Sequence, residues 1–202
     1  TIARLKLSGK RIPYFGVKES VFPFDKMPEV DPVLGPEMRS TGEVLGMEKT
    51  FGLAYYKSQE AAQQTLPIEG TVLISVTSRD RPAVLEVAKR FSDLGFRIKA
   101  TEGTRDFLAQ NGIIAEHINK LHEGRPNIED AIKNKEINLV INTPIGKMSQ
   151  HDDSYIRKSA IKYKVPYITT LAAALAAVKG IADFKKGATA VRSLQSYHES
   201  LR

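Results

Sequence analysis

The sequence predicts an α/β protein in which a parallel five-stranded sheet carries helices on both faces. After Gly70, short apolar runs typical of strands alternate with segments whose apolar residues have helical spacing. The run INLVIN at 137–142 is apolar enough for a parallel strand that is buried on both faces. Such alternation is typical of a parallel sheet whose strands are joined by helical crossovers.

The first expected strand is TVLISV at 71–76, and the first helix follows at 81–95. Pro82 suits the first turn of that helix, where no backbone N–H is needed, and Gly95 suits its end. The apolar residues of this segment recur on one helical face: Val84, Val87, Ala88 and Phe91.

The later segments alternate in the same way. Strands are expected at 96–100, 115–119, 137–142 and 166–168, and helices at 104–112, 127–135, 152–164 and 170–181. Asp152 and Asp153 are interpreted as the start of their helix, because carboxylates there cap it and favour its dipole. The tail, 183–202, is expected either to form one more helix or to fray.

The first 64 residues differ from the rest and are rich in proline and glycine. Ser40 and Glu43 have capping-box spacing, and the apolar positions that follow favour a helix from Ser40 onward. Residues 65–70 are expected to be a linker. A segment with so little core of its own, in a chain that starts at Thr1, is expected to be the remainder of a larger domain.

Composition narrows the class of protein. The 202 residues include no cysteine, which excludes disulfides and thiolate chemistry and is compatible with the cytoplasmic location that we expect. The longest apolar stretch is interrupted by Lys179 and Asp183, so no membrane span is expected. The net charge is +7, but lysine and arginine are scattered, which favours a small anionic ligand over nucleic acid.

Polar groups follow four of the expected strands, and carboxyl ends of parallel strands meet at one sheet edge. Hydroxyls, helix N-termini, lysine and arginine are suited to phosphate, although a threonine before a helix can equally be a simple N-cap. The groups are Ser75, Thr77, Ser78 and Arg81; Thr101, Gly103 and Thr104; Asn119, Lys120 and Arg125; Asn142, Thr143, Gly146 and Lys147.

Other chemistry lacks support in the sequence. Neither a GxGxxG motif nor a P-loop is present. The four histidines lack metal-ligand spacing, so no metal site is expected. No residues are arranged as a nucleophile with its base, so no catalytic residue is expected in this chain.

Specific motifs carry a resemblance. DPVLGPEMRSTGEV at 31–44 resembles the end of the second ATP-grasp domain in the large subunit of carbamoyl phosphate synthase. TVLISVTSRDR, KATEGTRDFLAQNGI and NKLHEGRPNIEDAIKNKEINLVINTP resemble its C-terminal allosteric domain, a Rossmann-like module shared with methylglyoxal synthase. The resemblance implies an incomplete ATP-grasp segment at 1–64, the allosteric domain at 71–182 and a tail at 183–202.

The resemblance also implies a function for the parent enzyme. It would make carbamoyl phosphate for pyrimidine and arginine biosynthesis from glutamine-derived ammonia, bicarbonate and ATP, with Mg or Mn. The implied partners are the rest of the large subunit and a small glutaminase subunit. The chain alone would hold no cofactor and would not catalyse this reaction.

The family's regulatory site binds UMP or IMP. The matching positions here are Ser75, Arg81, Thr101, Thr104, Lys120, Asn142 and Thr143. Arg81 replaces a lysine of the bacterial pattern, and Pro144 replaces a threonine, so the identity of the nucleotide stays open. For a second effector, ornithine, the matching positions are Glu19, Tyr167 and Thr169, which would form only part of a site.

Two other functions are alternatives. The domain could serve docking or homo-oligomerisation, with a vestigial nucleotide site. A methylglyoxal-synthase-type lyase is disfavoured, because the family's Gly-Gly-Asp-Gln-like run is replaced by NTPIGKMSQ at 142–150.

Overall fold

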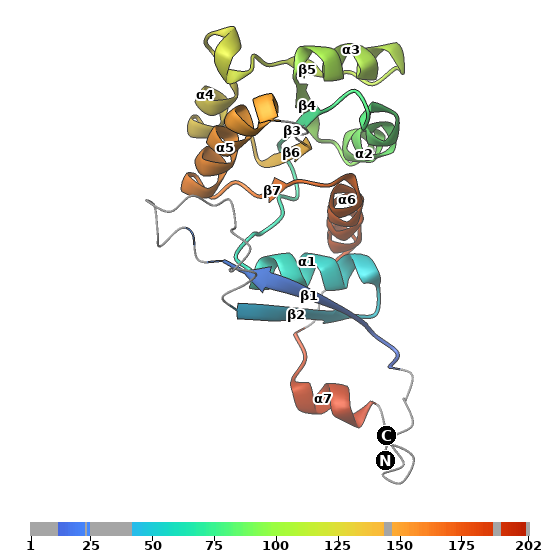
Figure 1. Ribbon diagram of the computed structural model, residues 1–202. Helices are drawn as coiled ribbons and strands as arrows, with labels where there is room; N and C mark the ends of the chain where they lie inside the picture. Colours follow the sequence, from blue (N-terminus) through green and yellow to red (C-terminus); the bar gives the residue numbers. More distant parts are fainter. Residues whose placement is uncertain (1–11, 23, 25–41, 144–146, 188–190, 201–202) are drawn as a thin grey trace.

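The computed structural model describes residues 12–22, 24, 42–143, 147–187 and 191–200, with the backbone alone for 147–153 (Figure 1). The strands are β1 (Phe15–Val21), β2 (Gly42–Glu48), β3 (Thr71–Val76), β4 (Arg97–Ala100), β5 (Glu116–His117), β6 (Leu139–Thr143) and β7 (Tyr167–Ile168). The α-helices are α1 (Phe51–Ala61), α2 (Arg81–Asp93), α3 (Glu102–Gln110), α4 (Ile128–Lys133), α5 (Lys147–Lys162), α6 (Leu171–Lys185) and α7 (Leu194–Glu199), and η2 (Leu121–Glu123) is a 3-10 turn.

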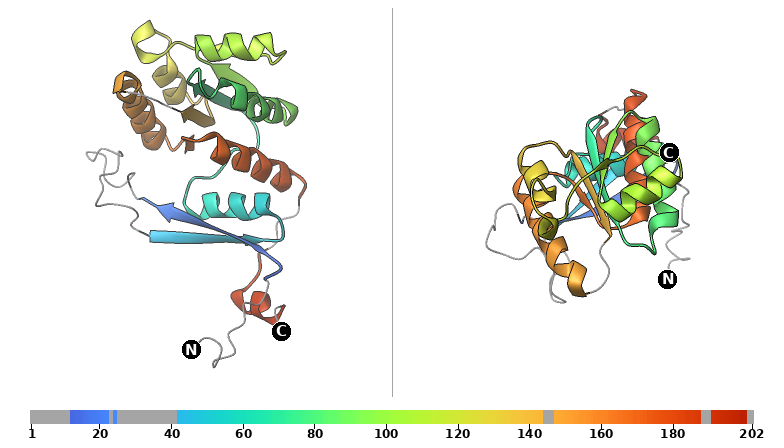
Figure 2. Two further views of the ribbon diagram at one scale, coloured as in Figure 1. Left: turned by 45° about the vertical axis from the view of Figure 1, so that its right-hand side comes forward. Right: turned by 90° about the horizontal axis from the view of Figure 1, so that it is seen from above.

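The expected parallel sheet is confirmed. Its five strands have the order β5-β4-β3-β6-β7, and every neighbouring pair is parallel. Apolar residues of α2, α3 and α6 pack on one face, and those of α4 and α5 pack on the other. The view from above shows these two helical layers on opposite sides of the strands (Figure 2).

The two cores follow from the alternation of side chains along the strands. Ile74 and Ile141 point into the core under α2 and α6, and Leu73 and Val140 point into the core under α4 and α5. All four are fully buried, which is why the strands read as nearly continuous apolar runs.

The predicted helix from Ser40 is wrong for residues 42–48, which form β2 and pair antiparallel with β1. Val44, Gly46 and Glu48 alternate inward, and a Cβ on Gly46 would collide with the α1 backbone at Ala54 and Ser58. Glycine at that position allows a strand to lie directly on α1. The helix begins only at Phe51, where the Thr50 hydroxyl caps the N–H of Leu53. Ser40 itself lies outside the described residues.

Helix α1 packs tightly on α6, so the β1–β2 hairpin and the parallel sheet lie on opposite sides of this helix pair (Figure 1). Two glycines make the contact: a Cβ on Gly180 would lie 3.0 Å from the carbonyl oxygen of Gly52. Next to it the rings of Tyr56 and Phe184 stack with their centroids 4.2 Å apart.

Helix α5 starts earlier than expected, and the tail adds one more helix. Helix α5 begins at Lys147, so Asp152 and Asp153 lie inside the helix and do not cap it. The tail forms helix α7, which decides between the two expected outcomes. This helix lies under the hairpin, where the Tyr197 hydroxyl donates to the Met47 carbonyl and Arg192 stacks against Tyr14 and Tyr197.

Candidate functional site

The sheet has one topological switch point, between β3 and β6. The chain leaves β3 into α2 on one face and leaves β6 into α5 on the other. Such divergence opens a crevice outside the carboxyl ends of the two strands, where ligands bind in open α/β sheets. Ser75 pairs with Asn142 and Val76 with Thr143 across this point. The sequence-predicted residues of β3 and β6 are therefore neighbours.

Three buried polar atoms at this crevice have no hydrogen-bond partner among the described residues. They are the Thr77 hydroxyl just after β3, the Thr143 hydroxyl at the end of β6, and Arg81 Nε at the start of α2. A buried polar group without a partner costs free energy, so such groups are rare unless a ligand, ion or water completes them. All three are capable donors, which suits an anion.

Arg81 reaches from α2 to the N-terminus of α3. Its guanidinium lies against Gly103, where a Cβ would collide with Arg81 Nη2. Gly103 therefore makes room for the cation beside the first turn of α3, an end that already carries partial positive charge. Arg81, which the sequence analysis expected in the site, therefore lies directly against Gly103 at the N-terminus of α3.

Thr101 and Thr104 hold the beginning of α3 against β3. Thr101 is the N-cap residue, but its hydroxyl lies 3.5 Å from the Thr104 hydroxyl and does not cap the helix. The Thr104 hydroxyl lies 3.3 Å from both the N–H and the carbonyl oxygen of Val76. The hydrogen-bonding capacity of the Thr104 hydroxyl is thus used by the Val76 backbone, and Thr104 positions the site. Thr101 does not cap the helix with its side chain, so it is not a simple N-cap.

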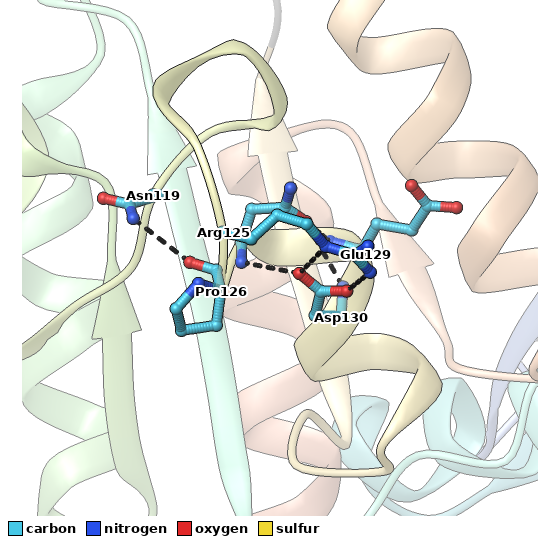
Figure 3. A network of polar contacts seen from close by, with 6 residues as sticks. Asn119, Arg125, Pro126, Glu129 and Asp130 are labelled. Carbon is cyan, nitrogen blue, oxygen red and sulfur yellow. Dashed lines mark hydrogen bonds and ion pairs between the residues drawn. The ribbon is translucent and has the colours of Figure 1, made fainter.

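Lys120 follows β5 and lies further along the same edge. Its ammonium is half-exposed and lies 3.8 Å from the Glu123 carboxylate. The loop that carries it is closed by Asn119, whose side chain donates to the Pro126 carbonyl and whose own carbonyl accepts from Ile128 (Figure 3).

Arg125, grouped with Lys120 in the sequence, has a different role. It forms a bidentate ion pair with the Asp130 carboxylate, which also accepts a hydrogen bond from the N–H of Asn127 (Figure 3). Hydrogen bonding by Arg125 lowers the pKa of Asp130 to about 2, against a smaller opposing effect of desolvation. Arg125 therefore braces the loop and does not join the strand-end cluster.

A hollow of about 630 Å³ lies beside this ion pair, on the α4–α5 side of the sheet. Its charged lining includes Arg125 and Asp130, which neutralise each other, and Glu129 with Lys133. Arg125 is the one member of the predicted strand-end groups that lines it, and none of the positions matched to the nucleotide site does. The strand-end crevice remains the better candidate because its unpaired donors point to one kind of ligand.

Of the three positions matched to ornithine, two lie on different sheets and the third lies in a connection between elements. Glu19 is on β1 and accepts a hydrogen bond of 2.8 Å from Gln59 of α1. Tyr167 is on β7, and its hydroxyl accepts a hydrogen bond of 2.8 Å from the Asn142 side chain. Thr169 is exposed between β7 and α6. The structure thus connects Tyr167 to a residue of the expected nucleotide set.

Two residues of the predicted strand-end groups, Thr77 and Gly103, are absent from the nucleotide-site positions that the resemblance implied. The signal for Thr77 was its position directly after a strand. That for Gly103 was its place in the first turn of a helix, where glycine has no conformational advantage. Pro144, the expected departure from the bacterial pattern, lies outside the described residues.

The described part of the chain contains no group of three or more histidine, aspartate or glutamate side chains that could hold a metal ion. In the same residues, no helix is both long and apolar enough to cross a membrane.

Comparisons with known proteins find a matching domain model and relatives that align with most of the chain. Residues 83–169 match the family model described as an MGS-like domain. The carbamoyl phosphate synthase large chain of Archaeoglobus fulgidus is 54% identical over 190 residues, covering 94% of this chain and 18% of the relative. A separate C-terminal section of that large chain, from Aquifex aeolicus, is 54% identical over 172 residues, covering 85% of this chain and 32% of the relative.

The chain therefore spans less than a third of the length of these two relatives. Among solved structures, methylglyoxal synthase from Elizabethkingia anophelis NUHP1 is 14% identical, with a TM-score of 0.44 over 66% of this chain and 93% of the other.

Proposed function

This chain belongs to the family of carbamoyl phosphate synthase large chains, and we propose that its parallel sheet is a regulatory domain that binds a nucleoside monophosphate at the carboxyl ends of β3, β4 and β6. The relatives at 54% identity bear the name of that synthase, and the MGS-like match falls within the parallel-sheet domain. The effector would be of the UMP or IMP type.

One observation carries this proposal: three buried donors without partners gather at the switch point of the sheet. Thr77, Thr143 and Arg81 each present a polar atom that the described protein groups leave unsatisfied. A phosphate has enough acceptor oxygens to satisfy all of them at once. Arg81 beside the α3 N-terminus adds the positive charge that favours a dianion.

Regulation would act by linkage. A ligand that binds one arrangement of this domain against the synthetase body more tightly shifts the equilibrium between arrangements. The packing of α1 on α6 supports this, because it joins the sheet domain to the hairpin through side-chain contacts. The hairpin would belong to the end of an ATP-grasp domain whose other parts, together with a glutaminase subunit, complete the enzyme.

The synthase reaction, with ATP and its metal ions, is proposed for the parent enzyme and not for this chain alone. A contribution of Glu19, Tyr167 and Thr169 to an ornithine site is part of the same proposal. So is a cytoplasmic location. Glu19 supports the diamine proposal by its charge, because a carboxylate suits an ammonium group.

Calorimetric titration of the 202-residue chain with UMP, and then IMP, in phosphate-free buffer tests the proposal. We expect binding that Arg81→Gln weakens about tenfold or more, since a hydrogen bond to a charged group is lost. Lys120→Ala should weaken it as well. The matched control is Arg79→Gln, an exposed arginine of the same loop, which should leave binding unchanged.

The absence of heat with either nucleotide, in a chain shown to be folded by circular dichroism, would contradict effector binding. It would favour the docking alternative. Binding that survives both Arg81→Gln and Lys120→Ala would contradict the location of the site.

A further inference from the structure

We infer that Tyr167 is a positioning residue of the nucleotide pocket, which fixes Asn142 through its hydroxyl and so makes the pocket's selectivity depend on the position of β7. This inference rests on the proposed function. It concerns a residue that touches the pocket only through another side chain.

The geometry of the pair begins with the strand register. Tyr167 pairs with Val140, and Asn142 lies two residues further along β6. Side chains two residues apart share one face of a sheet, so Asn142, Val140 and Tyr167 all point toward the α4–α5 side. Two residues span about 6.6 Å along a strand, a length that a tyrosine ring covers. The hydroxyl therefore reaches the carboxyl edge, where it lies 2.8 Å from Asn142 Nδ2.

Both partners are held in place. Asn142 is buried, so the loss of a hydrogen bond there is not simply replaced by water. The Tyr167 ring packs against the core under α4 and α5, and the Arg157 guanidinium lies 5.5 Å from its centroid. The hydroxyl consequently has one preferred position, which in turn selects an orientation of the Asn142 amide.

The pair faces away from the unpaired phosphate donors. Thr77 and Arg81 follow β3, and Thr143, although it is next to Asn142 on β6, alternates to the opposite face of the sheet. Asn142 and Tyr167 lie on the face that α4 and α5 cover. A ligand with its phosphate at β3 and β4 would extend across β6 with its nucleoside. Asn142 would then contact the nucleoside, and Tyr167 would influence that part of the ligand and not the phosphate.

The strand of Tyr167, β7, also leads into α6, the helix that packs on α1 beside the hairpin. Thr170, two residues after the end of β7, caps α6, and α6 packs on α1 through Gly180 and Phe184. A shift of α6 against α1 would move Tyr167 and change the orientation of Asn142. The pocket would respond to the neighbouring domain through the hydrogen bond between Tyr167 and Asn142.

The experiment compares affinities for UMP and for inorganic phosphate in the full chain. Tyr167→Phe removes the hydroxyl alone. We expect it to lower the affinity for UMP about three- to tenfold, which is the range for one hydrogen bond, and to leave the affinity for phosphate unchanged. In the Asn142→Ala background the same change should have no further effect, because nothing remains to be oriented. The matched control is Tyr163→Phe, directly after α5 and packed against the same core, which should leave both affinities unchanged.

Other outcomes separate the two proposals. If the wild-type chain binds neither UMP nor IMP, the proposed function fails and this inference fails with it. Two outcomes would overturn the inference alone, in a chain that binds UMP. In the first, Tyr167→Phe leaves the UMP affinity unchanged. In the second, Tyr167→Phe lowers the UMP affinity by the same factor in the wild-type and the Asn142→Ala backgrounds. Equal weakening of UMP and phosphate would indicate a general structural role for Tyr167 and would also overturn it.

Discussion

The hydroxyl of Thr104 bonds to both backbone groups of Val76, its N–H and its carbonyl oxygen, each at 3.3 Å. The first turn of α3 is thereby fixed to the carboxyl end of β3, although the two residues are 28 positions apart. Because Thr104 is almost fully buried, this contact sets where the α3 N-terminus lies relative to the crevice.

Thr104→Val should therefore both destabilise the fold and weaken ligand binding. The substitution keeps the volume and leaves the Val76 backbone groups without this partner, which costs about 1–3 kcal/mol of unfolding free energy. Urea unfolding measures that loss, and Thr104→Ser, which keeps the hydroxyl, is the control. Wild-type stability in Thr104→Val would show that the Val76 contact contributes nothing.

Gly103→Ala should weaken nucleotide binding without loss of stability. Alanine in the first turn of α3 favours the helix, by up to about 1 kcal/mol, but its methyl group occupies the place of the Arg81 guanidinium. We expect a nucleotide affinity close to that of Arg81→Gln, measured by calorimetry beside thermal unfolding. In the Arg81→Gln background, Gly103→Ala should cost no further affinity. A full additional loss would mean that Gly103 acts independently of Arg81.

Much of the fold could be predicted from the sequence, because the parallel strands are buried on both faces. The sequence segments around Ile74 and Val140 must be apolar on both faces because each strand contributes to two cores. Such segments can be recognised as strands in the sequence without knowledge of the fold. The hairpin could not be predicted in this way. Its strand β2 has helical spacing of apolar residues by coincidence, and the decisive residue is Gly46, whose missing side chain matters only once α1 is beside it.

The candidate site shows the same limit. Ser75, Asn142 and Thr143 could be placed at one edge because parallel strands end there together. The Thr77 hydroxyl lacks a hydrogen-bond partner among the described residues, and this depends on which groups the fold brings near, which the local sequence does not contain. The bond between Asn142 and Tyr167 likewise joins residues 25 positions apart.

The contact of α1 with α6 should be sensitive to a single methyl group. Gly52→Ala places a Cβ against the Asp183 carboxylate and 2.9 Å from the Lys179 carbonyl oxygen. Overpacking of this kind costs about 1–3 kcal/mol, and it should separate the helices before it unfolds the sheet. Hydrogen exchange should show faster exchange in α1 and β2 with unchanged protection in β3. Uniform protection in both regions would contradict a tight helix contact.

Acid should weaken the loop that carries Lys120. The hydrogen bonds from Arg125 lower the pKa of Asp130 to about 2, below the usual value of 3.8. A lowered pKa means that the folded state favours the charged carboxylate. The stabilisation is therefore complete above pH 4 and is lost as the pH falls toward 2. In Asp130→Asn, stability should depend less on pH between 4 and 2, as followed by urea unfolding at several pH values. The exposed Asp106, changed to Asn, is the control, and an identical pH dependence in wild type and Asp130→Asn would show that the ion pair does not stabilise the loop.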